Sequence, residues 1–215
     1  HEALSSRSST ISAGARNSAD EPRKTVFVGM SGGVDSSISA YLLKEAGFNV
    51  IGVFIKTWQP GEDELEGGAV CTWKDDRRDA MRVCAHLGIP FRTLDLEETY
   101  KTYVADYMIS EYAAGRTPNP DIMCNKHVKF GGFFKYAMEQ GADFVATGHY
   151  AQTRDTKGGR NSDKDVELVL SEDENKDQTY FLWAIPAEIL TKTVFPVGGL
   201  QKDEVRIIAE YAQLP

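Results

Sequence analysis

One glycine- and serine-rich segment has the residue types that bind phosphate groups. It follows a short β-branched run and precedes a helical pattern. Backbone N–H groups at the start of a helix carry the positive end of the helix dipole, and glycines let the main chain approach phosphate oxygens closely. We therefore predict that this loop binds the phosphates of a nucleotide. Its residues are Gly29, Met30, Ser31, Gly32, Gly33, Val34, Asp35 and Ser36.

The loop differs from the Walker type of phosphate loop. That type reads G-x-x-x-x-G-K-[ST], and here no lysine stands at the required place. Transfer of a γ-phosphoryl group is therefore not indicated. A second explanation needs no ligand: a Gly-Ser turn in which Asp35 or Ser36 acts as the N-cap of the following helix.

A proline-punctuated loop, residues 117–126, carries a cysteine that could act as a nucleophile. Cys124 precedes a predicted helix, and a helix N-terminus with neighbouring cations stabilises a thiolate. Between Arg116 and Lys135 the chain has four Lys or Arg residues against Asp121 alone, a local balance of +3. Asp121 is a candidate for handling protons beside Cys124. The competing explanation is that Cys124 is an ordinary buried small residue.

The elements that must position these loops alternate between strand and helix patterns from Lys24 onward. This alternation predicts an α/β fold, a parallel sheet with helices on both faces. The predicted strands are 24–30, 49–55, 91–96 and 143–150, and the predicted helices are 36–46, 75–87, 126–140 and 202–212. A tyrosine stripe from Tyr100 to Met108 has helical spacing and is expected to be core. Short strands at 151–154 and 166–171 predict a hairpin excursion.

Length and composition restrict the class of protein. A chain of 215 residues with 41% hydrophobic content can bury one substantial core, with a fragment of a second domain. No run of 18 apolar residues occurs, so no membrane association is predicted. The net charge is −8, so any RNA contact must come from a local basic patch.

The cysteines and the N-terminal residues indicate the compartment. Cys71, Cys84 and Cys124 are odd in number and lack C-x-x-C spacing, which argues against a disulfide framework and against a zinc site. We predict a reducing, cytoplasmic location and no protein-bound metal cluster. Residues 1–23 are rich in Ser, Ala and Arg and are expected to be a flexible tail. A transit peptide has a similar composition, but Glu2 and Asp20 disfavour it.

The phosphate loop resembles the S-G-G-x-D-S loop of the ATP-pyrophosphatase (PP-loop) superfamily, whose members adenylate a carbonyl or carboxyl oxygen. With further segments, the chain resembles the tRNA-specific 2-thiouridylases, which make 2-thiouridine at the wobble position. The resemblance runs from Gly29 to Arg206. The segments that carry it are 29–36, 53–58, 117–125, 146–151, 176–182, 195–198 and 205–206.

The resemblance implies a role for individual residues. Ile55 and Gly148 would join the phosphate loop in binding ATP, and Cys124 would be a catalytic cysteine. The residues implied to contact RNA are Asn119, Pro120 and Asp121 at the target base, His149 beside nucleotide and RNA, and Lys176, Asp177 and Gln178 on the tRNA. His149 could instead be a strand-end histidine with satisfied hydrogen bonds. Residues 176–178 could be a solvated turn.

The resemblance also implies a domain division and a chemistry. An adenine nucleotide alpha hydrolase-like PP-loop domain would span 24–170, and a truncated tRNA-binding region, the start of a second small domain, would span 171–215. ATP with Mg²⁺ would adenylate the uridine O2, a cysteine-borne persulfide would attack C2, and disulfide chemistry would resolve the enzyme-bound sulfur.

The same resemblance places the persulfide cysteine just after the segment that resembles 205–214, and this chain stops at Pro215. The chain is therefore expected to bind ATP without completing turnover alone. The expected partners are tRNA and a sulfur-donor or sulfur-carrier protein. Two alternatives stay open: another ATP-pyrophosphatase of the synthetase or amidotransferase type, and a non-catalytic ATP- or RNA-binding fragment.

Overall fold

The protein is built on a five-stranded parallel sheet with the strand order β3-β2-β1-β4-β7, together with a separate two-stranded hairpin. The structure, a computed structural model, describes residues 22–58, 73–155 and 166–215. Within those ranges the sheet strands are β1 (Thr25–Gly29), β2 (Asn49–Lys56), β3 (Phe91–Asp95), β4 (Phe144–Ala146) and β7 (Thr193–Val194). The antiparallel hairpin is β5 (Gln152–Asp155) with β6 (Val166–Val169).

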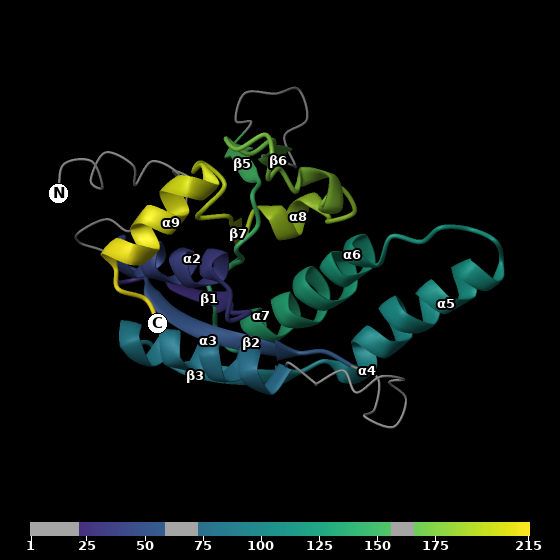
Figure 1. Ribbon diagram of the computed structural model, residues 1–215, viewed down its shortest axis with the longest axis horizontal. Coiled ribbons are helices and arrows are strands. Elements are labelled where there is room, and N and C mark those ends of the chain that lie inside the picture. The colour runs from purple at the N-terminus through teal and green to yellow at the C-terminus, as the bar shows by residue number, and fades with distance from the viewer. Residues whose placement is uncertain (1–21, 59–72, 156–165) are drawn as a thin grey trace.

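Helices connect the strands and cover both faces of the sheet (Figure 1). The longer ones are α2 (Val34–Glu45), α3 (Trp73–Leu87), α5 (Asp106–Ala113) and α9 (Lys202–Tyr211). The shorter ones are α4 (Glu97–Tyr100), α6 (Pro120–Met123), α7 (Phe134–Glu139) and α8 (Ala187–Leu190). Two π-helical segments, η4 (Lys101–Ala105) and η5 (Cys124–Phe133), and a 3₁₀ turn, η6 (Thr179–Phe181), complete the set. The expected α/β sheet with helices on both faces is confirmed.

The alternation of side chains along β1 explains the two layers. Val26 and Val28 are fully buried on one face, in a core with residues of α2 and α3. Phe27 is fully buried on the other face, where it packs with η5 and α7. Because both faces of the central strand are covered, its buried residues form an apolar run, Val26 to Val28, instead of alternating with polar residues. α9 packs against α2 through a third cluster that includes Ile38 and Val205.

The order of the strands creates a binding position between β1 and β4. The chain moves outward from β1 through β2 to β3, then returns to place β4 on the other side of β1. In open parallel sheets, ligands bind at such a reversal, outside the carboxyl ends of the strands. The phosphate loop follows β1, and residues 147–150 follow β4, so both lie at this position.

The structure corrects several expected boundaries. The helix expected at 126–140 begins at Pro120, with Asn119 as its N-cap, and includes the π segment η5. The strand expected at 143–150 ends at Ala146. β7 was not anticipated, because a two-residue strand has no periodicity to detect. The hairpin forms as expected, while its connection and most of the N-terminal tail lie outside the described residues.

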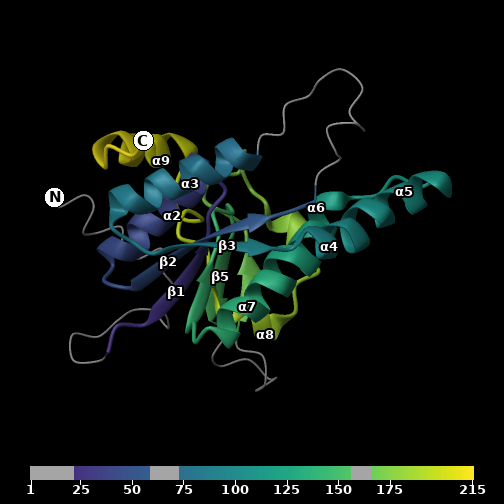
Figure 2. The same cartoon turned by 90° about the horizontal axis from the view of Figure 1, so that it is seen from below.

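The tyrosine stripe is only partly core. Val104 is buried, but Tyr103 is 48% exposed and stacks on His127 with ring centroids 4.6 Å apart. The stripe belongs to one continuous helix, α4–η4–α5, whose α5 end extends away from the sheet in both views (Figures 1 and 2). Among the helices that the structure describes, none is both long and apolar enough to cross a membrane.

Candidate active site

The phosphate loop has the geometry of an anion site. Gly33 occupies the N-cap position of α2, and glycine has no side chain that could accept from the first-turn N–H groups. The explanation in which Asp35 or Ser36 caps the helix is therefore wrong. The Ser36 hydroxyl instead braces the loop, because it donates to the Gly33 carbonyl at 2.9 Å and accepts from the Ser31 N–H at 3.2 Å. The α2 N-terminus is left open to a ligand.

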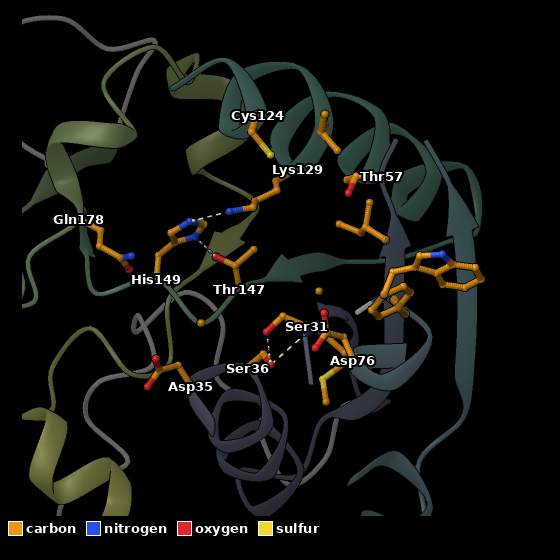
Figure 3. Close-up of a pocket in the computed structure, with 17 residues that line it drawn as sticks. Ser31, Asp35, Ser36, Thr57, Asp76, Cys124, Lys129, Thr147, His149 and Gln178 are labelled. Atoms are coloured by element: carbon orange, nitrogen blue, oxygen red, sulfur yellow. Dashed lines mark hydrogen bonds between the residues drawn. The ribbon is translucent and has the colours of Figure 1, made fainter. Parts of the chain in front are cut away.

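A cavity of about 370 Å³ opens beside this loop (Figure 3). Ten of the residues singled out in the sequence line it: Gly29, Met30, Ser31, Asp35, Ser36, Ile55, Cys124, Gly148, His149 and Gln178. Ser31, Asp35 and Ser36 lie on one side, and Cys124 lies on the opposite side with its sulfur directed inward (Figure 3). Residues from the ends of β1, β2 and β4 and from η5 therefore meet in one space.

Seven further lining residues were not singled out in the sequence. They are Phe54, Thr57, Trp73, Asp76, Val128, Lys129 and Thr147. Phe54 and Thr57 flank Ile55 in a segment that already carried a resemblance, so the sequence held a signal for them. Lys129 had been counted only as part of the basic patch. Trp73 and Asp76 come from the start of α3, and nothing local in the sequence indicates that this helix end reaches the cavity.

Asp35 is bound by two residues from distant parts of the chain. Its carboxylate accepts from the Tyr150 hydroxyl at 2.9 Å and from the Lys202 ammonium at 2.5 Å. Burial and the Asp35 carboxylate hold the pKa of Tyr150 well above its ordinary value, so the phenol remains a hydrogen-bond donor. Lys202 begins α9, so the last helix is attached directly to the phosphate loop.

Cys124 is a half-buried free thiol at the start of η5. Because the helix begins four residues earlier, at Pro120, the thiol does not lie at the helix N-terminus as the sequence suggested. Burial raises the pKa of Cys124, the Lys129 charge lowers it, and the Asp121 charge raises it, with a net increase. The expected stabilisation of the thiolate by the helix end is therefore not present, and Lys129 is the cation that favours the anion.

His149 connects Lys129 to the end of β4. The Lys129 Nζ lies 3.3 Å from His149 Nε2, and His149 Nδ1 lies 2.7 Å from the Thr147 hydroxyl. His149 is only 7% exposed. Burial, and then the Lys129 charge, hold the pKa of His149 well below its ordinary value, so the imidazole is neutral. The explanation of His149 as a residue with satisfied hydrogen bonds fits these contacts, but the residue also lines the cavity.

The other predicted RNA-binding residues have structural contacts of their own. Asn119 caps α6, its side-chain oxygen accepting from the Asp121 N–H at 3.1 Å and the Ile122 N–H at 3.3 Å. Gln178 accepts from the Tyr150 N–H at 2.9 Å, and Asp177 accepts from the Ser171 N–H at 2.7 Å. Of the seven residues in the predicted RNA set, His149 and Gln178 line the cavity, and the other five do not.

No group of three or more His, Cys, Asp or Glu side chains in the described ranges is arranged to hold a metal ion. Two carboxylates, Asp35 and Asp76, do line the cavity. Mg²⁺ commonly binds through one or two protein carboxylates together with substrate phosphates, so this donor set suits a cation that arrives with a nucleotide.

The comparisons with known proteins agree on a family. A family model described as the tRNA methyl transferase HUP domain matches residues 24–215. The chain is 53% identical to the tRNA-specific 2-thiouridylase MnmA of Christiangramia forsetii over 86% of this chain and 46% of that protein. It is 52% identical to the protein of the same name from Staphylococcus carnosus, over 86% of this chain and 47% of that protein.

A solved structure shares the fold. A 4-thiouridine synthetase in complex with RNA and bound ATP superimposes with a TM-score of 0.50 at 17% identity, covering 88% of this chain and 40% of that one. This likeness supports the architecture alone. The chain spans about half the length of the curated relatives it matches. On the family model and on relatives of which more than half the aligned residues are identical, the chain belongs to the tRNA-specific 2-thiouridylase family.

Proposed function

We propose that the chain is the ATP-binding and catalytic part of an enzyme that replaces the O2 atom of the wobble uridine of tRNA with sulfur. One observation carries the proposal: a single cavity joins an open phosphate loop to a cysteine directed inward. An ATP-pyrophosphatase that is not a thiolase needs the loop but has no use for the cysteine. Membership of the 2-thiouridylase family supports the same reading.

The cavity suits ATP at the phosphate loop. The open N-terminus of α2 would bind the phosphates, and Ile55 and Gly148 would lie beside the adenosine. Gly148 must be small here, since a Cβ at this position would lie 2.7 Å from the Ser36 nitrogen and 2.8 Å from the Asp35 carbonyl carbon. Mg²⁺ bound to the phosphates would offset their charge, with Asp35 and Asp76 as the available carboxylates.

The chemistry requires a poor leaving group to become a good one. Adenylation of the uridine O2, with pyrophosphate leaving toward the α2 N-terminus, would make the oxygen depart as AMP when sulfur attacks C2. The outer sulfur of a persulfide supplied from elsewhere in the protein would attack C2, and AMP would leave with the former O2. The Cys124 thiolate would then attack the inner sulfur of the carrier, so that the S–S bond breaks, a disulfide forms between Cys124 and the carrier cysteine, and the outer sulfur remains on C2. Asp121 would accept or return protons near Cys124.

Residues around the helix start would contact the tRNA. Asn119, Pro120 and Asp121 would meet the target base, and Lys176, Asp177 and Gln178 would meet the tRNA beside it. Lys126 and Lys176 are exposed, and Tyr180 and Trp183 near the second segment are 68% and 69% exposed. Exposed cations and aromatic rings are the side chains that bind phosphate and stack on unpaired bases. A sulfur-carrier protein is the second proposed partner. The proposed location of the reaction is the cytoplasm.

The test is sulfur transfer by the full-length protein that contains this chain. The protein receives ATP, Mg²⁺, a sulfide source and unmodified tRNA, and both 2-thiouridine and AMP are measured by mass spectrometry. Cys124→Ser and Asp35→Ala are each compared with native protein. Cys84→Ala is the matched control, because Cys84, a residue of α3, is fully buried against β2 and does not line the cavity.

The proposal predicts that Cys124→Ser and Asp35→Ala lose 2-thiouridine and that Cys84→Ala retains it. Full thiolation by Cys124→Ser would remove that residue from the chemistry. ATP cleavage to AMP without thiolation, in native protein, would favour another ATP-pyrophosphatase. ATP binding with no AMP at all would favour a non-catalytic binding module.

A further inference from the structure

Lys129 occupies a defined position between Cys124 and the end of β4. Its ammonium is directed at His149, and all three side chains border the cavity (Figure 3). An ammonium group can only donate hydrogen bonds. His149 Nε2, 3.3 Å from the Lys129 Nζ, must therefore be the unprotonated nitrogen that accepts. The ring proton then sits on Nδ1 and is donated to the Thr147 hydroxyl at 2.7 Å.

These contacts fix the role of His149 as an acceptor. Burial, and after it repulsion from the Lys129 charge, disfavour a protonated imidazole and hold the pKa of His149 well below its ordinary value. At neutral pH the ring is a neutral base whose lone pair points at Lys129. The contribution of His149 is to hold the lysine by accepting one hydrogen bond. An ammonium has three N–H groups, so two N–H groups of Lys129 are not used in that bond.

The π-helical segment explains why Lys129 and Cys124 reach the same cavity. In an α-helix of about 3.6 residues per turn, residues five apart lie on different faces. A π-helix instead pairs residue i with residue i+5. Cys124 and Lys129 are five residues apart within η5, and both line the cavity. Gly131 supports this winding, because a Cβ there would lie only 3.0 Å from the Lys126 carbonyl, five residues earlier.

The groups around Cys124 differ in sign. Asp121, from α6, opposes ionisation of the thiol, and Lys129 favours it. Tyr100, from α4, is a third neighbour of the thiol. Burial raises the pKa of this phenol most, and the charges of Cys124 and Asp121 raise it further. Lys126 is nearer to Cys124 in sequence but is exposed and does not line the cavity. Of the cations in the basic patch, Lys129 is therefore the one placed to stabilise a sulfur anion.

We propose that Lys129 is the charge partner of the Cys124 thiolate and that His149 is the positioning residue that holds Lys129 against it. The chemical purpose of this pair rests on the proposed thiolation. A thiolate is the form that attacks a sulfur carrier, and a buried anion needs a cation beside it to form. The π segment supplies that cation from the same helix, and β4 supplies the acceptor that orients it.

The test is the pH dependence of alkylation at Cys124. The thiolate displaces iodide from iodoacetamide, forming a sulfur–carbon bond, so the rate follows the thiolate fraction. Rates between pH 6 and pH 10 are read from the Cys124 peptide by mass spectrometry. Lys129→Met is compared with native protein, with Lys129→Arg, which retains the charge, and with Lys126→Met, which removes a charge from the same helix outside the cavity.

We expect Lys129→Met to slow alkylation about tenfold at pH 7.5, the effect of raising the Cys124 pKa by one unit. Lys129→Arg should restore most of the rate, and Lys126→Met should change it less than twofold. His149→Leu should slow alkylation in the same direction, while His149→Gln, whose amide oxygen can accept from Lys129, should slow it less. Equal profiles for native protein, Lys129→Met and His149→Leu would overturn the proposal.

Cys84 provides an internal control for folding. It is fully buried, and burial raises its pKa to about 11. A variant that unfolds will alkylate Cys84, whereas one that only loses the charge partner will not. The alkylation readout does not require sulfur transfer. A charge effect at Cys124 in a protein that never forms 2-thiouridine would support this inference and contradict the proposed function. Formation of 2-thiouridine by a protein whose Cys124 alkylation does not depend on Lys129 would support the proposed function and contradict this inference.

Discussion

At the scale of single residues, two free cysteines illustrate how surroundings decide chemistry. Cys84 is a core residue of α3 that packs against β2 at Gly52, where a Cβ would meet its sulfur at 2.4 Å. Cys124 borders the cavity with an acidic, a basic and a phenolic neighbour. Burial raises the pKa of both thiols, but only Cys124 has a cation that counteracts it. Of the two cysteines that the structure describes, Cys124 is therefore the one placed to react.

The neutral state of His149 predicts a pH dependence of stability. In the unfolded chain a histidine has a pKa of about 6.5, while in the folded chain burial and Lys129 hold the His149 pKa well below that. Below pH 6.5 the unfolded state binds a proton that the folded state does not bind. The free energy of unfolding should therefore fall by about 1 to 2 kcal/mol between pH 6.5 and pH 5 through this residue.

Urea unfolding at pH 5, 6, 7 and 8 checks the effect. His149→Gln should lose less stability than native protein between pH 6.5 and pH 5, because the titrating ring is gone. His86→Gln, on the exposed side of α3, is the matched control and should behave like native protein. If native protein and His149→Gln lose the same free energy of unfolding between pH 6.5 and pH 5, His149 takes up a proton in the folded chain as it does in the unfolded chain, and the prediction is wrong.

At the scale of elements, the α6–η5–α7 helix carries both structural and proposed RNA contacts. Asn119 caps its first turn, so its side chain has a stabilising role independent of RNA. Asn119→Ala should lower the free energy of unfolding by about 1 kcal/mol, and Asn119→Asp, which keeps the capping oxygen, should lower it by less. Thermal or urea unfolding measures both.

The same pair of variants separates the cap from the proposed base contact. If Asn119 also contacts the target base, Asn119→Asp should keep stability but lose thiolation, since a carboxylate lacks the amide donor. If Asn119→Asp retains full thiolation, Asn119 caps the helix and does not contact the target base through its amide donor.

α9 is joined to the phosphate loop by the Lys202–Asp35 ion pair, whose side chains are 17% and 33% exposed. Lys202→Met should lower the free energy of unfolding by about 1 to 2 kcal/mol, because a partly buried charged hydrogen bond is lost. Arg206→Met is the control on the same helix. Its partner Asp203 is 84% exposed, so the loss should be below about 0.5 kcal/mol. Equal losses of stability in Lys202→Met and Arg206→Met would contradict the prediction that the partly buried ion pair stabilises the fold more than the exposed one.

At the scale of the whole molecule, residues beyond 170 contribute to the same site as the phosphate loop near residue 29. β7 pairs with β4 in register, and Gln178 and Lys202 bond to Tyr150 and Asp35. The predicted division at residue 170 stays a prediction, and residues on both sides of it contribute to the sheet and to the cavity.

The close contact at Gly198 tests how rigidly these parts fit. A Cβ at this position would lie 1.6 Å from the Ala151 carbonyl oxygen and 2.6 Å from its carbon, so backbone would have to move. Gly198→Ala should cost about 3 kcal/mol of stability. Gly29→Ala, where a Cβ would meet nothing nearer than 3.6 Å, should cost far less. Thermal unfolding of the two variants decides the point, and similar melting temperatures would contradict it.

The sequence alone determined the features that depend on local pattern. The β-branched run ending at Gly29, the helical spacing after it and the glycines between them specify a strand, a loop and a helix, and hence a candidate anion site. The apolar character of β1 on both faces likewise indicates a buried parallel strand. These features could be predicted because strand and helix periods and turn residues act over a few positions.

Only the tertiary structure decided which side chains meet. Lys129 and His149 are 20 residues apart and Asp35 and Lys202 are 167 apart, and no local pattern encodes those contacts. The start of the helix at Pro120 went unpredicted although the sequence carries its signal, an Asn119 N-cap followed by a proline at the first helical position. The π winding of η5 has no such local signal. Trp73 and Asp76 reach the cavity through the placement of α3. Their presence follows from long-range packing, which composition and periodicity do not specify.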